Sequence, residues 1–333
     1  MNRLHHLSWL AVCLLAAPVF AESKLAGDAS HQLDKQTVFG NQKSMGHLSQ
    51  EPVRVELITR AELEATHAID LKDALKYSAG IQMRKLRGKS GEGVWLQGYD
   101  SDRVAVLIDG IPLAAGTGSS VDINQIAIGD VERIEISKGS MSAIYGTSAM
   151  GGVVNVITQT PKQGQAASFN YSGGSWGSQD EDHENVPMGK QHVQAQYSMG
   201  SPNGFTQVVL DSQISNGFSA PETNGTQGWS GDKLNLSGKS VFRLNEKTDL
   251  TVSPRLYRED ILTLQDDYKA GRSVEDAKID KTEKNYVSSV LQTRLSNNGL
   301  LKLNYSFENF HNESRQDENT TNFIDQKRLT DIT

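Results

Sequence analysis

The stretch RIEISKGSMSAIYGTSAMGGVVNVIT, residues 133–158, contains two β-type runs, 134–137 and 153–158, joined by a bridge of small residues. The bridge carries no cluster of catalytic side chains. Its four glycines are Gly139, Gly146, Gly151 and Gly152. Glycine allows positive φ and the close approach of one backbone to another. The stretch therefore predicts a tightly packed structural element rather than an active site.

The residues ahead of this stretch predict a compact α+β unit that begins near Pro52. Alternating apolar residues from Val53 to Leu57 indicate a half-buried strand. Thr59 and Glu62 have the spacing of a capping box, which starts a helix. A second helix is predicted over residues 70–77, with its apolar face formed by Leu71, Ala74 and Leu75.

Asp109 and Gly110 follow a predicted strand over residues 104–108. Asp-Gly is a preferred pair for a two-residue hairpin turn, because both positions take positive φ. We therefore interpret Asp109 as a turn residue and not as a catalytic carboxylate.

Three segments resemble the plug domain of TonB-dependent outer-membrane receptors. They are DLKDALKYSAGI (70–81), VAVLIDGIPL (104–113) and DVERIEISKGSMSAIYGTSAMGGVVNVIT (130–158), and they occur in the family's order. The resemblance covers residues 52–161, called the plug below. It implies a domain that fills the lumen of a barrel of about 22 strands and gates it. Gly110 and the four bridge glycines are then its packing and gating positions.

Two positions depart from the pattern of the family. The family usually has arginine where this chain has Gln97, and Arg-Gly-Pro where it has Lys138, Gly139 and Ser140. The resemblance implies that these arginines pair with barrel carboxylates. Gln97 cannot form such a pair, and Lys138 can do so only without a bidentate fork.

After residue 161 the chain shows seven runs in which apolar and polar residues alternate, as barrel strands do. Polar members such as Gln194, Gln196 and Ser198 are expected to face the lumen. The apolar markers of the runs are Phe169 and Tyr171; Val193 to Met199; Val208 to Ile214; Leu234 to Leu244; Leu250 to Leu256; Val287 to Leu295; and Leu301 to Phe307.

The predicted connections alternate in length. Short turns are expected at 201–204, 245–247 and 296–299, and long polar loops near 175–190, 215–232 and 258–285. Outer-membrane barrels have short periplasmic turns and long extracellular loops, whereas a soluble β-sandwich has no reason to sort its loops in this way. The predicted fold is an α+β plug followed by antiparallel transmembrane β-barrel strands.

Residues 162–333 hold about seven of the roughly 22 strands that the resemblance implies. The expectation is that the chain is the N-terminal part of a longer receptor or a truncated gene product. A truncated, non-transporting remnant that acts only as a binding protein, for phage, toxin or TonB, is therefore an alternative from another functional class.

The N-terminus predicts export. Residues 1–21 have the pattern of a signal peptide, with Arg3 ahead of a short apolar core and cleavage expected after Ala21. Residues 22–51 are polar and predict a flexible periplasmic segment. The short apolar interruption Thr37, Val38, Phe39 is the candidate TonB box, a segment that would add as a strand to TonB.

The composition excludes several classes of function. The formal net charge is −7 with no basic patch, which argues against nucleic-acid binding. The only cysteine, Cys13, lies in the predicted signal peptide, and no nucleophile elbow, phosphate loop or zinc-protease motif occurs. The acidic run 180–184 lacks metal-ligand spacing, so no metal site is predicted. The chain is predicted not to be an enzyme and to need no cofactor.

The resemblance implies an outer-membrane receptor that takes up a scarce ligand with TonB as its energy-transducing partner. A ferric siderophore is the expected ligand, with haem and cobalamin as alternatives. A cationic loop predicted near the ligand vestibule could attract an anionic metal chelate. It contains Arg84, Lys85, Arg87 and Lys89. The other expected contact is outer-membrane lipid around the barrel.

Overall fold

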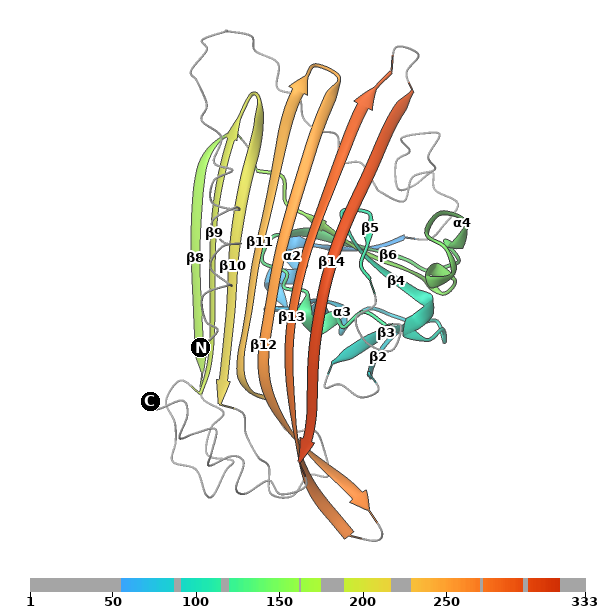
Figure 1. Ribbon diagram of the computed structural model, residues 1–333, viewed down its shortest axis with the longest axis vertical. Helices are drawn as coiled ribbons and strands as arrows, with labels where there is room; N and C mark the ends of the chain where they lie inside the picture. Colours follow the sequence, from blue (N-terminus) through green and yellow to red (C-terminus); the bar gives the residue numbers. More distant parts are fainter. Residues whose placement is uncertain are drawn as a thin grey trace.

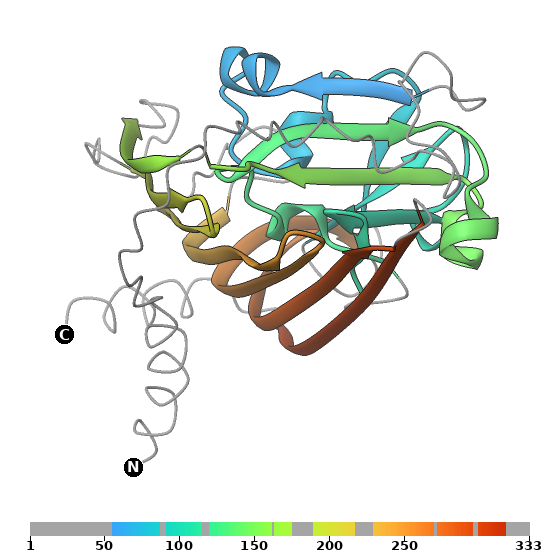
Figure 2. The same cartoon turned by 90° about the horizontal axis from the view of Figure 1, so that it is seen from above.

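The computed structural model describes residues 55–86, 91–114, 120–161, 163–174, 189–216, 229–269, 272–295 and 299–317. Of residues 264–277 it describes the backbone only where they lie in these ranges. The predicted signal peptide, the segment 22–51 and the loops near 175–188 and 217–228 lie outside these ranges. Two layers are present, the plug and a long curved sheet (Figures 1 and 2). None of the helices in the described ranges is long and apolar enough to cross a membrane.

The plug is built on a five-stranded sheet with the strand order β1-β6-β7-β4-β5. Its strands β4 and β7 run parallel, and the other pairs are antiparallel. A separate two-stranded ribbon pairs β2 with β3. The bounds are β1 Val55–Thr59, β2 Ile81–Lys85, β3 Glu92–Leu96, β4 Val104–Ile108, β5 Ile111–Pro112, β6 Val131–Ser137 and β7 Gly152–Thr158.

Both predicted helices are present, and the second, α3, is shorter than the predicted range 70–77. The capping box is present, since Thr59 and Glu62 exchange both hydrogen bonds at the start of α2. Asp70 caps the second helix, and Leu71, Ala74 and Leu75 are buried as predicted. The bounds are α2 Arg60–Ala65, α3 Leu71–Leu75, α4 Ser142–Tyr145, η2 Ser101–Arg103, η3 Ile123–Gln125 and η4 Thr147–Ala149.

The seven predicted alternating runs form one antiparallel sheet in chain order, β8 to β14. This curved sheet wraps part of the way around the plug, which lies against its concave face (Figure 2). The predicted fold class is thereby confirmed. The strands are β8 Gly164–Gly174, β9 Lys190–Ser201, β10 Gly204–Asn216, β11 Trp229–Asn245, β12 Thr248–Lys269, β13 Arg272–Arg294 and β14 Leu300–Asp317.

One prediction about the curved sheet is wrong. The stretch 258–285 was expected to be a long loop, but most of it continues β12 and β13 as an extended hairpin (Figure 1). The two strands stay in register, with Arg258 opposite Glu283 and Asp260 opposite Lys281. Cross-strand pairs of opposite charge stabilise a sheet without apolar alternation. The predicted short turns at 201–204 and 245–247 are present.

Candidate functional site

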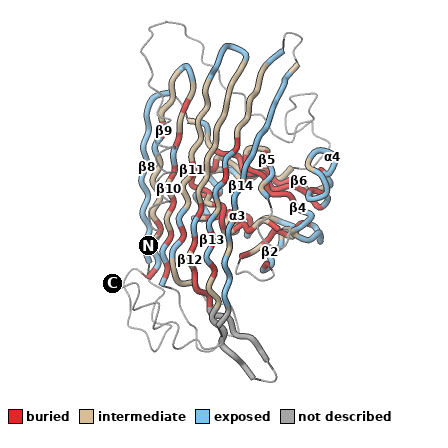
Figure 3. Tube along the Cα trace, viewed as in Figure 1, coloured by how far each residue is buried: buried red, intermediate tan, exposed pale blue. Residues whose placement is uncertain are grey.

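The concave face of the curved sheet is polar and the convex face is apolar. On the strands that the plug covers, every second side chain faces the plug, among them Gln194 and Gln196, as predicted. Buried polar residues on the described strands include Gln207, Asp211, Gln213, Lys233, Ser237, Glu259, Thr282 and Ser288. The large apolar side chains that alternate with them are exposed. They include Phe169, Val208, Ile214, Leu234, Val287, Leu301, Leu303, Tyr305 and Phe307. Figure 3 shows buried residues along the middle strands, whereas β8 at the edge of the sheet is exposed along its whole length.

Asp109 joins the plug to the curved sheet. It stands in a turn in which Asp109 and Gly110 have φ of 50° and 80°, as the predicted hairpin requires. The Asp109 carboxylate accepts hydrogen bonds from Thr158 N at 2.9 Å and Thr158 Oγ1 at 2.6 Å. It also accepts one from Lys239 Nζ on β11 at 3.0 Å. Lys239 donates a second hydrogen bond, 2.7 Å long, to Thr158 Oγ1.

The charge on Asp109 is stabilised by these partners. Burial alone would raise the pKa of the Asp109 carboxyl, but the Lys239 ammonium and the hydrogen bonds from Thr158 outweigh it and lower the pKa below its usual value. Asp109 is therefore ionised at neutral pH and holds three donors. The interpretation of Asp109 as a turn residue alone was incomplete.

Asp130 makes the second charged contact between the two layers. Its Oδ2 atom accepts hydrogen bonds from Arg255 Nη2 on β12 at 2.7 Å and from Ser237 Oγ on β11 at 3.1 Å. Asp130 and the Arg255 side chain are both largely buried. In both charged contacts the carboxylate belongs to the plug and the cation belongs to the curved sheet.

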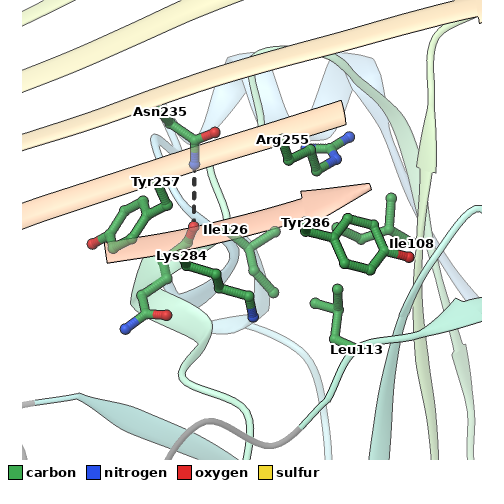
Figure 4. Close-up of a pocket in the computed structure, with 9 residues that line it drawn as sticks. Ile108, Leu113, Ile126, Asn235, Arg255, Tyr257, Lys284 and Tyr286 are labelled. Atoms are coloured by element: carbon green, nitrogen blue, oxygen red, sulfur yellow. Dashed lines mark hydrogen bonds between the residues drawn. The ribbon is translucent and has the colours of Figure 1, made fainter. Parts of the chain in front are cut away.

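A pocket beside Arg255 lies between the plug and the curved sheet (Figure 4). Asn235 Nδ2 donates to the main-chain oxygen of Gln125 at 3.1 Å. The Gln125 side-chain amide reaches Glu259 Oε1 at 3.4 Å. Apolar plug residues form one side of the pocket, and polar or aromatic residues of the curved sheet form the other. Its lining is Ile108, Leu113, Gln125, Ile126, Asn235, Arg255, Tyr257, Lys284 and Tyr286.

Asp70 is a buried carboxyl near the same interface. It caps α3 by accepting a hydrogen bond from Asp73 N at 2.9 Å. Burial, with the neighbouring charge of Asp73, raises the pKa of Asp70 to about 7, although Lys233 of the curved sheet opposes the rise.

The predicted ligand residues are only partly described. Arg84 and Lys85 lie on β2, at the end of the plug toward the β12–β13 hairpin (Figure 1). The Arg84 guanidinium lies 3.7 Å from the centre of the Trp95 ring and donates to Gln82 Oε1 at 3.2 Å. Arg87 and Lys89 lie outside the described residues, as do Thr37, Val38 and Phe39 of the candidate TonB box.

Lys138 does not contact the curved sheet as the resemblance implied. Its ammonium pairs with Glu56 of the plug and donates to the main-chain oxygen of Ala79 at 2.6 Å. Gln97 has a φ of 50°, and its N–H donates to Gly80 O at 3.0 Å. Lys138 therefore stabilises the plug internally, while Asp109 and Asp130 make the charged contacts to the sheet.

Sequence reasoning missed Asp130, Lys239 and Arg255 as functional candidates. A signal was present, because Lys239 lies on the lumen-facing parity of a run whose even-numbered positions, Leu234 and Leu236, are apolar. A charge at such a position faces the plug. Its partner could not be read from the sequence, since 130 residues separate Lys239 from Asp109.

Comparison with known proteins gives the family of the plug. Residues 47–153 match the family model of the TonB-dependent Receptor Plug Domain. The vitamin B12 transporter BtuB of Vibrio cholerae is 38% identical over 122 residues, which are 36% of this chain and 20% of that protein. The Vibrio vulnificus protein of the same name is 33% identical over 120 residues, again 20% of its length. These matches therefore span about one fifth of each relative.

Solved structures share the fold over more of the chain. The alcaligin outer membrane receptor FauA of Bordetella pertussis aligns with a TM-score of 0.55 at 18% identity, covering 80% of this chain and 40% of that one. The siderophore receptor PirA of Acinetobacter baumannii aligns with a TM-score of 0.52 at 15% identity, covering 79% and 44%. At sequence identities of 15% and 18%, the two alignments show that the fold is shared, with the plug and the strands in the same arrangement.

Proposed function

Because the chain carries a plug domain of the TonB-dependent receptor family, followed by strands arranged as in those receptors, we propose that the protein is an outer-membrane receptor for energised uptake of a scarce small ligand. The plug is its gate, and the contacts between the plug and the curved sheet hold the gate closed. The proposal takes residues 1–21 as a signal peptide, 22–51 as a periplasmic segment, 52–161 as the plug and 162–333 as barrel.

The observation that carries the proposal is the reversed polarity of the curved sheet. On the middle strands its convex face exposes large apolar side chains such as Val208, Ile214 and Leu234, which are 44%, 45% and 40% exposed. The neighbouring Gln207, Gln213 and Lys233 on the concave face are buried. Its concave face is polar and meets the plug. A sheet with an apolar outside and a polar inside suits lipid around it and an aqueous lumen within.

The chemistry of the interface suits a gate. A permanent core would be apolar, but the contacts between the plug and the curved sheet include hydrogen bonds and ion pairs. Water can replace these polar contacts when the two surfaces separate. The plug can therefore shift against the curved sheet at a moderate cost in free energy.

For the ligand we propose a ferric siderophore. Arg84 and Lys85 put positive charge on the β2–β3 ribbon, and the Arg84–Trp95 pair offers a planar surface with hydrogen-bond donors. Such a surface suits an anionic chelate with aromatic or carboxylate groups. Cobalamin is the second candidate, because the relatives with 33 to 38% identity are named vitamin B12 transporters.

Transport assays test the proposal. Uptake of ⁵⁵Fe-loaded catecholate and hydroxamate siderophores and of radiolabelled cyanocobalamin is compared in wild-type cells, in cells that lack the gene and in cells that lack TonB. One of these probes should bind to the outer membranes of wild-type cells and of cells without TonB, but enter only the wild-type cells. Deletion of the gene should abolish both binding and uptake of that probe. Uptake that persists without TonB, or fractionation of the protein away from the outer membrane, would contradict the proposal.

A further inference from the structure

Two cations of the curved sheet have ion partners that belong to the plug. Lys239 donates to Asp109 and Thr158, and Arg255 donates to Asp130. The two cations lie on neighbouring strands, since Ser237, two residues before Lys239, is opposite Arg255 in the register of β11 and β12. Their side chains are 16% and 13% exposed, so the plug covers most of both.

Three carboxylates on the same face have partners within the curved sheet. Glu259 accepts hydrogen bonds from Tyr257 and Thr282, each 2.7 Å long. Glu308 pairs with Lys284 at 2.9 Å, and Asp211 contacts His192 at 2.8 Å. A shift of the plug would break the hydrogen bonds from Gln125 to Glu259 and from the Ala114 N–H to Glu308. It would leave each of these carboxylates with its partners on the curved sheet. It would remove the counter-charges of Lys239 and Arg255.

Arg255 also has a hydrogen-bond donor that Asp130 does not use. Its Nη2 atom donates to Asp130, but its Nε atom is buried and has no hydrogen-bond partner among the described residues. Arg255 borders the pocket of Figure 4 together with Lys284 and Tyr286. Guanidinium and ammonium groups bind carboxylate, catecholate and phosphate oxygens more strongly than neutral donors do.

We propose that Lys239 and Arg255 form an anion-binding site on the wall of the translocation path, and that Asp109 and Asp130 occupy this site while the gate is closed. The plug carboxylates take the place of the anionic groups of the ligand. When the plug shifts, they leave with it, and the two cations attract an anionic chelate into the opened path. This inference rests on the proposed function and assigns anionic chelates as its ligand class.

The charge preference of the opened pore tests the site without knowledge of the ligand. The intact protein is inserted into planar lipid bilayers, urea is added until the plug loosens and conductance appears, and the reversal potential is measured in a KCl gradient. The decisive variant, D109K/D130R/K239E/R255E, keeps both ion pairs with reversed polarity. A second variant, K239Q/R255Q, removes the two cations. K247E alters an exposed lysine in the β11–β12 turn and is the control for charge.

The ratio of Cl⁻ to K⁺ permeability should fall by at least about twofold in the reversed variant and by less in K239Q/R255Q, because charged rings in a pore select by sign. K247E should match the wild type. Opening with the same ratio in all four proteins would overturn the inference while leaving the gate in place. Failure of urea to open the wild type would overturn the gate, and the inference with it.

Discussion

At the scale of the residue, the contacts between the plug and the curved sheet depend on a few carboxyl groups in opposite electrostatic environments. Asp109 is half-buried beside a cation and two donors from Thr158, so its ionised form is favoured. Asp70 is buried with Asp73 nearby, so its ionised form is disfavoured. The ionised carboxylate of an aspartate thus stabilises the folded protein at Asp109 and destabilises it at Asp70.

Replacing Asp109 by asparagine should loosen the plug. The substitution leaves Lys239 buried without its counter-charge and weakens the bonds to Thr158, at a cost of about 2 to 3 kcal/mol. Hydrogen exchange of the β4 and β7 amides in the purified protein measures the loss, with Asp102→Asn, an exposed carboxylate, as the control. Equal protection of β7 in wild type and Asp109→Asn would contradict the assigned role.

The contribution of Asp109 depends on pH in a defined direction. Because its pKa is lower in the folded protein than in the unfolded chain, its stabilisation is complete above the unfolded pKa. It is lost as the pH falls through the folded value, which lies below the usual 3.8. The difference in protection between wild type and Asp109→Asn should therefore be constant from about pH 5 to about pH 8, because the Asp109 carboxyl is ionised in both the folded and the unfolded state over this range.

For Asp70 we expect the stability of the folded protein to change with pH in the opposite direction. Its folded pKa of about 7 exceeds the unfolded value, so stability falls as the pH rises from about 4 to about 7, by at most about 1.4 kcal/mol per pH unit. Asparagine is an equally good helix cap but does not ionise. Protection factors of the α3 amides should fall from pH 5 to pH 7 in wild type and stay level in Asp70→Asn. Parallel profiles would show that Asp70 is ionised throughout.

At the scale of the element, the bridge between β6 and β7 shows why the sequence is rich in glycine. Gly152 has a φ of 142°, and a Cβ atom there would lie 2.4 Å from both Leu96 Cδ2 and Ser137 O. At Gly151 the added atom would lie 2.4 Å from the Cβ of Tyr99. β3, β6 and β7 therefore approach one another so closely at Gly152 that a side chain there would clash.

Gly152→Ala should destabilise the plug by more than about 2 kcal/mol, since it combines an unfavourable φ with a clash against main-chain oxygen. Chemical denaturation followed by the fluorescence of Trp95 measures the effect. Gly174→Ala is the matched control, because that glycine ends β8 and nothing lies within 4 Å of an added Cβ. A Gly152→Ala protein as stable as the control would mean that β7 can move aside without cost.

The sequence predicts these elements well where local chemistry decides them. The capping box, the Asp-Gly turn and the seven alternating strands depend on neighbours within a few residues, and all are present. The extension of the β12–β13 hairpin was missed because it begins with charged residues that pair across the strands, such as Asp260 with Lys281 at 3.3 Å, and not with apolar alternation. The contacts of Asp109 and Asp130 depend on how two layers dock, which no local pattern encodes.

At the scale of the whole molecule, the proposed function requires a pulling force on the plug from its N-terminal side. The candidate TonB box, Thr37 to Phe39, lies outside the described residues, but the plug begins with β1 at Val55, close behind it in the chain. A segment that adds as a strand to TonB needs its main-chain N–H groups. Force applied there would reach the plug sheet through β1, which pairs with β6.

Val38→Pro should abolish energised uptake and leave ligand binding to outer membranes unchanged, because proline removes a donor from the added strand. Val38→Thr keeps the N–H group and the β-branched shape and should transport normally. Uptake and binding of the labelled probe identified in the transport assays measure both effects. Normal uptake by Val38→Pro would remove this segment as the contact with TonB.

The short connection between β7 and β8 limits how far the plug can travel. β7 ends at Thr158 and β8 begins at Gly164, so six Cα-to-Cα steps of about 3.3 to 3.6 Å allow an excursion of about 20 Å at full extension. The start of this connection is also held in place, since Gln159 bonds Gln196 at 3.0 Å and Thr158 bonds Lys239. A plug tethered in this way can pivot about its C-terminal strand or unravel from its N-terminal end. It cannot leave the lumen as an intact body unless β7 itself unfolds.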